Sequence, residues 1–140
     1  MKILCTYCSR KKDDSEDMLP AYKRYLGKHI KKVHNIATDR GLQYYILSGK
    51  FGLIFHQHEI EWYDFLLKCE DVSALIGRLQ IQIKEKNISS IDYYTESLNQ
   101  ESKVIPYFCA IKEACDKLKI EFNPIIFKKL REGDIIVPGE

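Results

Sequence analysis

Short apolar runs alternate along this chain with longer stretches of helical periodicity. Residues 2–7 and 43–48 are apolar runs with branched and aromatic side chains, which predicts two buried strands. Between them, apolar positions from residue 22 to residue 37 recur at steps of three and four, which predicts one amphipathic helix opened by Pro20 and ended by Gly41. Strand, helix and strand form a βαβ unit, so the two strands are expected to be parallel.

The second half of the chain continues the alternation after an irregular, aromatic-rich stretch over residues 53–69. Helices are predicted over residues 72–87 and 104–118, and strands over residues 88–95 and 120–122. The tail over residues 125–137 predicts a last helical turn and then an edge strand at residues 135–137.

This order of elements predicts a three-layer α/β fold with a mostly parallel open sheet of four or five strands and helices on both faces. We expect the strand order 2-1-3-4 for the four main strands and a single domain over residues 1–140. In such sheets ligands bind beyond the carboxyl ends of the strands. Here that edge carries the loops that follow Tyr7, Ser48 and Thr95.

Composition adds a local charge asymmetry to this picture. The chain has 140 residues, of which 45% are hydrophobic, and its net charge is only +2. The first 33 residues, however, hold nine basic side chains against four acidic ones. An anionic ligand is therefore expected at this end of the fold. For the lysines at positions 23, 28, 31 and 32, the solvated face of a helix is the alternative.

The sequence carries no sign of a membrane-spanning or secretory segment, because it has no run of 18 apolar residues and no signal-peptide pattern at its start. We therefore expect a cytoplasmic protein without a membrane partner. Its five cysteines are expected to be reduced thiols rather than a disulfide framework.

The loop after the first strand reads Cys8-Ser9-Arg10-Lys11-Lys12 and places a thiol, a hydroxyl and three cations shortly before a helix. Backbone amides at such a junction can bind an anion, and neighbouring cations reinforce them. Three consecutive cations repel one another, which favours an anionic ligand over chance. A merely solvated loop neutralised by Asp13 and Asp14 is the alternative.

The loop after the second strand reads Ser48-Gly49-Lys50-Phe51-Gly52 and brings another hydroxyl and another amine to the same edge. Two glycines allow a ligand to approach the backbone closely, although a turn alone also explains them. The order of residues is not that of a P-loop. We predict that Ser48, Gly49, Lys50 and Gly52 bind the ligand.

Metal and cofactor sites are not expected. Cys5 and Cys8 form a CxxC pair that no second pair completes, and His56 and His58 lack an evident third ligand, so surface histidines are expected. Tyr63 and Asp64 are the phenolic and acidic groups nearest the predicted edge, with Glu96 also near it. Tyr63 is assigned to ligand binding and Asp64 to proton transfer.

Taken in order, the Cys8 loop, the strand and turn over residues 45–53, and the pair Tyr63-Asp64 resemble a family of small uncharacterised bacterial, archaeal and phage proteins. Those proteins carry C-S-K-K-K, then I-L-S-A-K-[YH]-G-L, and later Y-D. The resemblance covers about the first half of the chain, with Arg10 in place of lysine and Gly49 in place of alanine.

The Cys8 loop is also distantly similar to the P-C-x-x-x-K-P-Y motif in the catalytic core of archaeosine synthase. In that enzyme of transfer-RNA modification, a lysine attacks the nitrile of a deazaguanine base. The resemblance implies that Cys8 matches the cysteine and Lys12 the lysine. Tyr7 stands where the motif has its first proline, and Asp13-Asp14 stand where it has Pro-Tyr.

Our leading hypothesis is an enzyme that acts on a nucleotide, a nucleobase or a base of nucleic acid. In it, Arg10, Lys11 and Lys50 hold phosphate, Ser9 and Ser48 donate hydrogen bonds, and Cys8 or Lys12 is the nucleophile. A non-catalytic nucleic-acid-binding module is the second hypothesis. A small protein-interaction domain that uses the aromatic residues 55–65 is the third. The sequence does not fix the oligomeric state.

Overall fold

The computed structural model describes residues 1–99 and 102–127, which form an α/β fold built on a five-stranded sheet. The strand order is β4-β3-β1-β6-β7, so the predicted order 2-1-3-4 of the main strands is confirmed. Four strands are parallel, and β4 pairs antiparallel with β3. The strands are β1 (Lys2–Tyr7), β3 (Tyr44–Ser48), β4 (Gly52–Phe55), β6 (Ser90–Thr95) and β7 (Glu121–Ile126).

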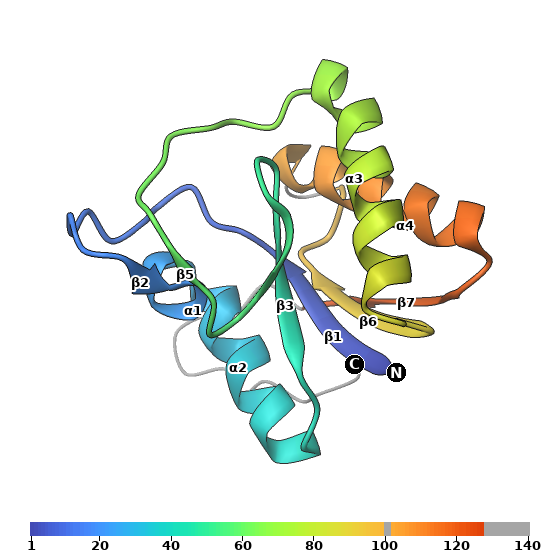
Figure 1. Cartoon of the computed structure of the whole chain (residues 1–140), viewed down its shortest axis with the longest axis horizontal. Helices are drawn as coiled ribbons and strands as arrows, with labels where there is room; N and C mark the ends of the chain where they lie inside the picture. The colour runs from blue at the N-terminus through green and yellow to red at the C-terminus, as the bar shows by residue number, and fades with distance from the viewer. Residues whose placement is uncertain (100–101, 128–140) are drawn as a thin grey trace.

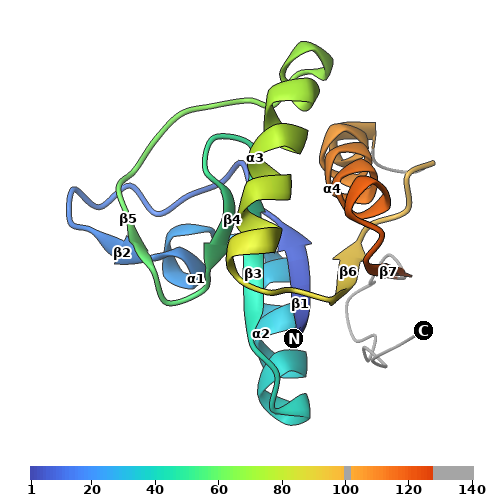
Figure 2. The same ribbon diagram turned by 45° about the vertical axis from the view of Figure 1, so that its right-hand side comes forward.

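Helices cover both faces of the sheet, which confirms the predicted fold class (Figure 1). One face carries α1 (Ala21–Arg24) and α2 (Lys28–Arg40), and the other carries α3 (Val72–Glu85) and α4 (Ile105–Leu118) (Figure 2). Short 3-10 turns, η1 (Cys69–Asp71) and η2 (Ser102–Val104), lead into α3 and α4. Beside the sheet, β2 (Leu19–Pro20) pairs with β5 (Glu59–Ile60).

Alternation along the strands divides the core between these two faces. In β1, Ile3 and Cys5 pack with the core beneath α3 and α4, whereas Leu4 packs with the core beneath α2. Every residue of β3 and of β6 is buried. Strands buried on both sides explain why the sequence shows apolar runs here rather than strict alternation.

The prediction of one helix from Pro20 to Gly41 is wrong, because residues 25–27 separate α1 from α2. Tyr25 is extended and forms an isolated antiparallel bridge with Lys12 of the preceding loop. The backbone N–H of Leu26 donates to the carbonyl of Lys11 at 3.0 Å. Backbone hydrogen bonds to the loop thus replace the hydrogen bonds of a helix at this point, although the spacing of apolar residues continues as in a helix. The end at Gly41 is confirmed, in the left-handed conformation.

Residues 52–55 also differ from the prediction, since β4 forms where irregular structure was expected after the turn. Gly52 takes a positive φ of +75° at the start of the strand. The outer edge of β4 is covered by the side chain of Gln82 from α3. Its amide accepts from the N–H of Leu53 at 2.8 Å and donates to the carbonyl of Phe51 at 3.1 Å. Strand formation here depends on contacts that are distant in sequence.

At the far edge, β7 is longer than the predicted strand over residues 120–122 and runs to Ile126. Residues 125 and 126 are extended, so a helical turn within the predicted tail would begin after them, where all residues but Phe127 lie outside the described part of the chain. The edge strand predicted at residues 135–137 lies outside the described residues. Over the part of the chain that is described, no helix has the length and apolar character needed to cross a membrane.

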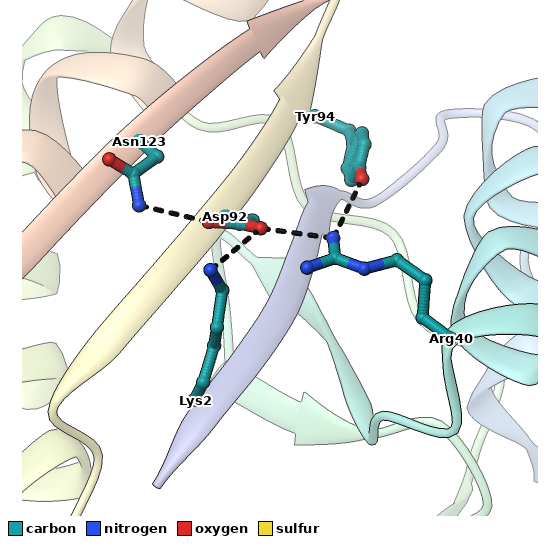
Figure 3. A network of polar contacts seen from close by, with 5 residues as sticks. All are labelled: Lys2, Arg40, Asp92, Tyr94 and Asn123. Atoms are coloured by element: carbon teal, nitrogen blue, oxygen red, sulfur yellow. Dashed lines mark hydrogen bonds and ion pairs between the residues drawn. The ribbon is translucent and has the colours of Figure 1, made fainter. Parts of the chain in front are cut away.

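A polar network joins three strands and α2 on the face that α2 covers (Figure 3). Asp92 of β6 accepts hydrogen bonds from Arg40 and Asn123, each at 3.0 Å, and lies 3.4 Å from the ammonium of Lys2. Burial alone would raise the pKa of Asp92, but these donors together lower it below its usual value. Asp92 is therefore ionised in the fold and holds β1, β7 and the end of α2 together.

Replacing Asp92 with alanine is expected to lower the free energy of unfolding by about 1–3 kcal/mol, because three donors lose their acceptor. The loss is limited because the side chains of Lys2 and Arg40 are 40% and 35% exposed and can return to water. Urea denaturation at neutral pH measures it. Asp116→Ala is the control, since Asp116 pairs with Lys112 in the exposed part of α4, where an ion pair contributes little to stability. Equal losses in the two variants would contradict a stabilising role for the network.

Candidate functional site

The predicted site residues lie at the carboxyl ends of β1 and β3, where three segments meet. The backbone N–H of Cys8 donates to the carbonyl of Leu47 at 2.8 Å, which holds the loop after β1 against the end of β3. Residues 61–68 run across this same end of the sheet before they reach α3 (Figures 1 and 2). Each segment carries candidate side chains of its own.

Two amines from different loops converge on one aromatic ring. The Nζ atom of Lys12 lies 4.6 Å from the centre of the Tyr63 ring, and the Nζ atom of Lys50 lies 5.5 Å from it. Within the described residues, no carboxylate oxygen lies within 4.0 Å of either amine. We call Lys12, Lys50 and Tyr63 the amine cluster. It joins the three predicted segments and brings together two positive charges that have no acidic partner in ion-pair range among residues 1–99 and 102–127.

Beneath the amine cluster, a chain of hydroxyl groups runs from Ser48 through Tyr63 to Tyr25. The Oγ of Ser48 lies 3.0 Å from the phenol oxygen of Tyr63, which forms a very short hydrogen bond with the phenol of Tyr25. Burial raises the pKa of Tyr63 and of Tyr25, and the nearby Cys8 raises both further. Both phenols are therefore neutral at physiological pH and can donate protons or hydrogen bonds.

The hydroxyl of Ser48 also shapes the turn that carries Lys50. Ser48 is fully buried, and its Oγ accepts from the backbone N–H groups of Lys50 and Phe51, each at 3.1 Å. The hydroxyl therefore fixes the position of Lys50 relative to Tyr63. The sequence predicted a direct bond from Ser48 to the ligand, whereas the bonds observed are internal to the fold.

The thiol of Cys8 lies beside this chain, half-buried at the end of β1. Its Sγ is 3.6 Å from the phenol oxygen of Tyr107 in α4. Burial raises the pKa of the Cys8 thiol, and its hydrogen bonds with Tyr107 and the Gly49 backbone, together with the Lys12 charge, oppose that rise only in part. A nucleophilic role for Cys8 therefore requires a base to remove its proton. Tyr107 was missed because nothing in the sequence links it to a loop 99 residues away.

Internal hydrogen bonds also hold the start of the Cys8 loop. The Oγ of Ser9 donates to the carbonyl of Lys11 at 2.8 Å and accepts from the N–H of Gly27 at 3.1 Å. The Nε2 of His29 lies 2.7 Å from the carbonyl of Tyr7, and the rings of these two residues stack with centres 4.0 Å apart. The sequence predicted a bond from Ser9 to the ligand, and His29 was not expected at the site because its helical spacing resembles that of any core position.

Arg24 anchors the rest of this loop from α1. Its side chain is fully buried, and its guanidinium donates to four backbone carbonyls. These belong to Asp13 at 2.6 Å, Ser15 at 3.0 Å, Asp17 at 2.6 Å and Ile60 at 3.2 Å. Five donors on one planar group make this multiple bonding possible. A buried arginine was not foreseen, because lysines and arginines of a predicted helix are normally solvated.

The remaining predicted residues take different positions. Arg10, Lys11 and Asp64 are exposed, and Asp64 follows directly after the buried Tyr63. At Gly52, a Cβ atom would stand 2.3 Å from the amide oxygen of Gln82, so the absence of a side chain there makes room for α3.

Gly49 packs closely against the segment of residues 61–68. A Cβ atom at this position would lie 3.0 Å from the Cβ of Leu67 and 3.2 Å from a ring carbon of Phe65. The absence of a side chain thus lets the turn after β3 touch the segment that carries Tyr63. The sequence predicted that glycine here lets a ligand approach the backbone closely. In the structure, the segment of residues 61–68 makes that close approach instead.

A groove of about 440 Å³ opens beside the outer edge of β4, apart from the predicted site. None of the residues assigned to the site lines it. Its walls come from β4, β5 and α3, with Leu53, Ile60 and Gln82 as examples. The amine cluster is therefore not a part of this groove, although Phe51 contacts both.

Histidine and cysteine residues do not gather into a metal centre in the described part of the chain, where no three metal-binding side chains come together. His58 is exposed as expected. His56 differs from a surface histidine, because its ring stacks on Tyr44 with centres 4.2 Å apart and is half-buried. Apolar packing in the βαβ unit accounts for this position.

Comparison of the chain with models of protein families, with curated proteins and with solved structures finds no match.

Proposed function

We propose that this chain is an enzyme that acts on a nucleotide, a nucleobase or a base of nucleic acid at the carboxyl ends of β1 and β3. The observation that carries the proposal is the amine cluster, in which Lys12 and Lys50 approach one tyrosine ring from two loops. Two ammonium groups held near each other repel, and a phosphate or other anionic group bound between them relieves that repulsion.

The surrounding groups support chemistry at this place. Lys12 and Cys8 are nucleophilic side chains beside the buried phenols. Tyr63 and Tyr107 are neutral phenols that can donate a proton or a hydrogen bond. Asp64 is exposed next to Tyr63 and serves in the proposal as the group that accepts a proton from the nucleophile. Arg10 and Lys11 extend the positive charge outward from the cluster.

Thermal unfolding with nucleoside monophosphates, free bases including deazaguanines, and short RNA and DNA tests the proposal. A ligand present at about 100 times its Kd is expected to raise the free energy of unfolding by about 2.7 kcal/mol. Lys12→Ala and Lys50→Ala should abolish that rise. Lys84→Ala is the matched control, because Lys84 is exposed in the last turn of α3, away from the three segments of the site.

Three outcomes separate the possibilities. Stabilisation by one class of small molecule that both variants lose supports a site at the amine cluster. A shift seen only with nucleic acid, which added salt removes and Lys12→Ala leaves intact, favours the non-catalytic binding module instead. Stabilisation that both variants retain contradicts the proposed site. Once a substrate is known, full activity in Lys12→Arg would remove Lys12 as the nucleophile, since a guanidinium cannot be deprotonated.

A further inference from the structure

Two large aromatic side chains are exposed on the segment of residues 61–68, which carries Tyr63. Trp62 is 52% exposed and Phe65 is 39% exposed, although both flank a tyrosine that is only 5% exposed. The Phe65 ring lies beside the turn that carries Lys50, since a Cβ atom placed on Gly49 would stand 3.2 Å from a carbon of that ring. Aromatic side chains of this size are costly to leave in water, so two of them beside one site indicate a contact surface.

Exposed cations lie on the Cys8 loop and on the turn after β3. Arg10 and Lys11 are exposed on the Cys8 loop, and Lys50 is exposed on the turn after β3. In the described residues, none of these three has an acidic group within 4.0 Å. The surface therefore combines flat apolar rings with positive charges from a neighbouring loop and turn. We call Trp62, Phe65, Arg10, Lys11 and Lys50 the aromatic rim.

We infer that the aromatic rim binds single-stranded nucleic acid, so that the base acted on at the amine cluster is presented within a strand. This inference rests on the proposed function. Proteins that bind single strands combine cations for the phosphates with aromatic rings on which successive bases stack. A paired duplex hides the faces of its bases from such rings. A protein partner would need acidic side chains placed opposite these cations, whereas a nucleic-acid strand supplies bases for the rings and phosphates for the cations together.

The size of the rim limits how much of a strand it can hold. The net charge of the chain is only +2, which argues against a long basic track. We therefore expect a footprint of a few nucleotides, with Trp62 and Phe65 stacking on bases beside the one at the amine cluster. Free mononucleotides lack those neighbouring bases and should bind more weakly.

Fluorescence of Trp62 tests the inference directly, because it is the only tryptophan of the chain. The protein is titrated with a nucleoside monophosphate, with single-stranded RNA and DNA octamers, and with a duplex of the same sequence. We expect the single strand to quench Trp62 and to bind at least about 10-fold more tightly than the monophosphate. Trp62→Ala and Phe65→Ala, with binding then followed by a labelled octamer, should each weaken binding about 5- to 100-fold.

Matched variants separate stacking from loss of fold. Trp62→Phe keeps an aromatic face and should retain most of the affinity. Ile81→Ala removes an apolar side chain that is 59% exposed on α3 and should leave affinity unchanged. Equal weakening in Ile81→Ala, or equal affinity for duplex and single strand, would overturn the inference.

The same titrations distinguish the inference from the proposed function. Monophosphate binding that needs Lys12, with no preference for the octamer and no effect of Trp62→Ala, overturns the inference and leaves the proposed function standing. Octamer binding that needs Trp62 but not Lys12 supports the rim and contradicts the proposed function. Self-association that Trp62→Ala removes, without nucleic-acid binding, overturns the inference in favour of a protein contact.

Discussion

Replacing Arg24 with alanine is expected to lower the free energy of unfolding by about 3–5 kcal/mol, because four backbone carbonyls lose their donors at once and a cavity opens. The carbonyls belong to the loop before β2 and to β5, which Arg24 ties to α1. Urea denaturation measures the loss. Proteolysis within residues 13–18 should also become faster, because this loop has lost its anchor.

Two further variants separate the contribution of the hydrogen bonds from that of packing. Arg24→Met fills most of the volume without donors, so it should lose nearly as much stability as Arg24→Ala. Lys23→Ala changes the exposed neighbour in the same short helix and should change stability by no more than about 0.5 kcal/mol. If Arg24→Met is as stable as the natural chain, the hydrogen bonds to the carbonyls do not contribute to stability.

Acid is expected to destabilise the fold through His29, by about 3 kcal/mol between pH 6.5 and pH 4. Burial lowers the pKa of His29 to about 4, with a smaller contribution from the charge of Lys32, while the hydrogen bond to the Tyr7 carbonyl opposes the change. Across this interval the unfolded chain binds a proton that the folded chain does not. Stability is therefore complete above about pH 6.5 and falls as the pH drops toward 4.

Urea denaturation at a series of pH values compares the natural chain with His29→Gln, which does not titrate and keeps an N–H for the Tyr7 carbonyl. The variant should be less stable at pH 7.5 but should lose about 3 kcal/mol less on acidification. His58→Gln is the control, because it makes the same substitution at an exposed histidine. Parallel pH profiles for the natural chain and His29→Gln would show that His29 is not the acid-sensitive group.

Much of the fold could be predicted because it depends on local patterns. Residues 2–7 form β1 as predicted, and apolar runs buried on both faces give the parallel strands of the sheet. The βαβ connection places the loops after Tyr7 and Ser48 at one edge. Sequence reasoning therefore anticipated that Lys12, Lys50 and Tyr63 would lie near one another.

The rest could not be predicted because it depends on pairing between distant residues. The helix ends at Arg24 only because the Cys8 loop pairs with residues 24–26, and β4 gains its outer partner only from Gln82 in α3. The hydroxyls of Ser9 and Ser48 were assigned to a ligand, but internal bonds occupy them. Tyr107, His29 and Arg24 reach the site region through tertiary contacts that leave no local pattern.

The two outer strands have a consequence for how the protein behaves when it is concentrated. An edge strand normally presents a row of N–H and C=O groups to which another chain can add. On β4, the Gln82 amide already occupies the N–H of Leu53 and the carbonyl of Phe51. On β7, Pro124 lacks an N–H and interrupts the row of donors. Both ends of the sheet are thus poor templates for strand addition, which protects crowded chains from edge-to-edge aggregation.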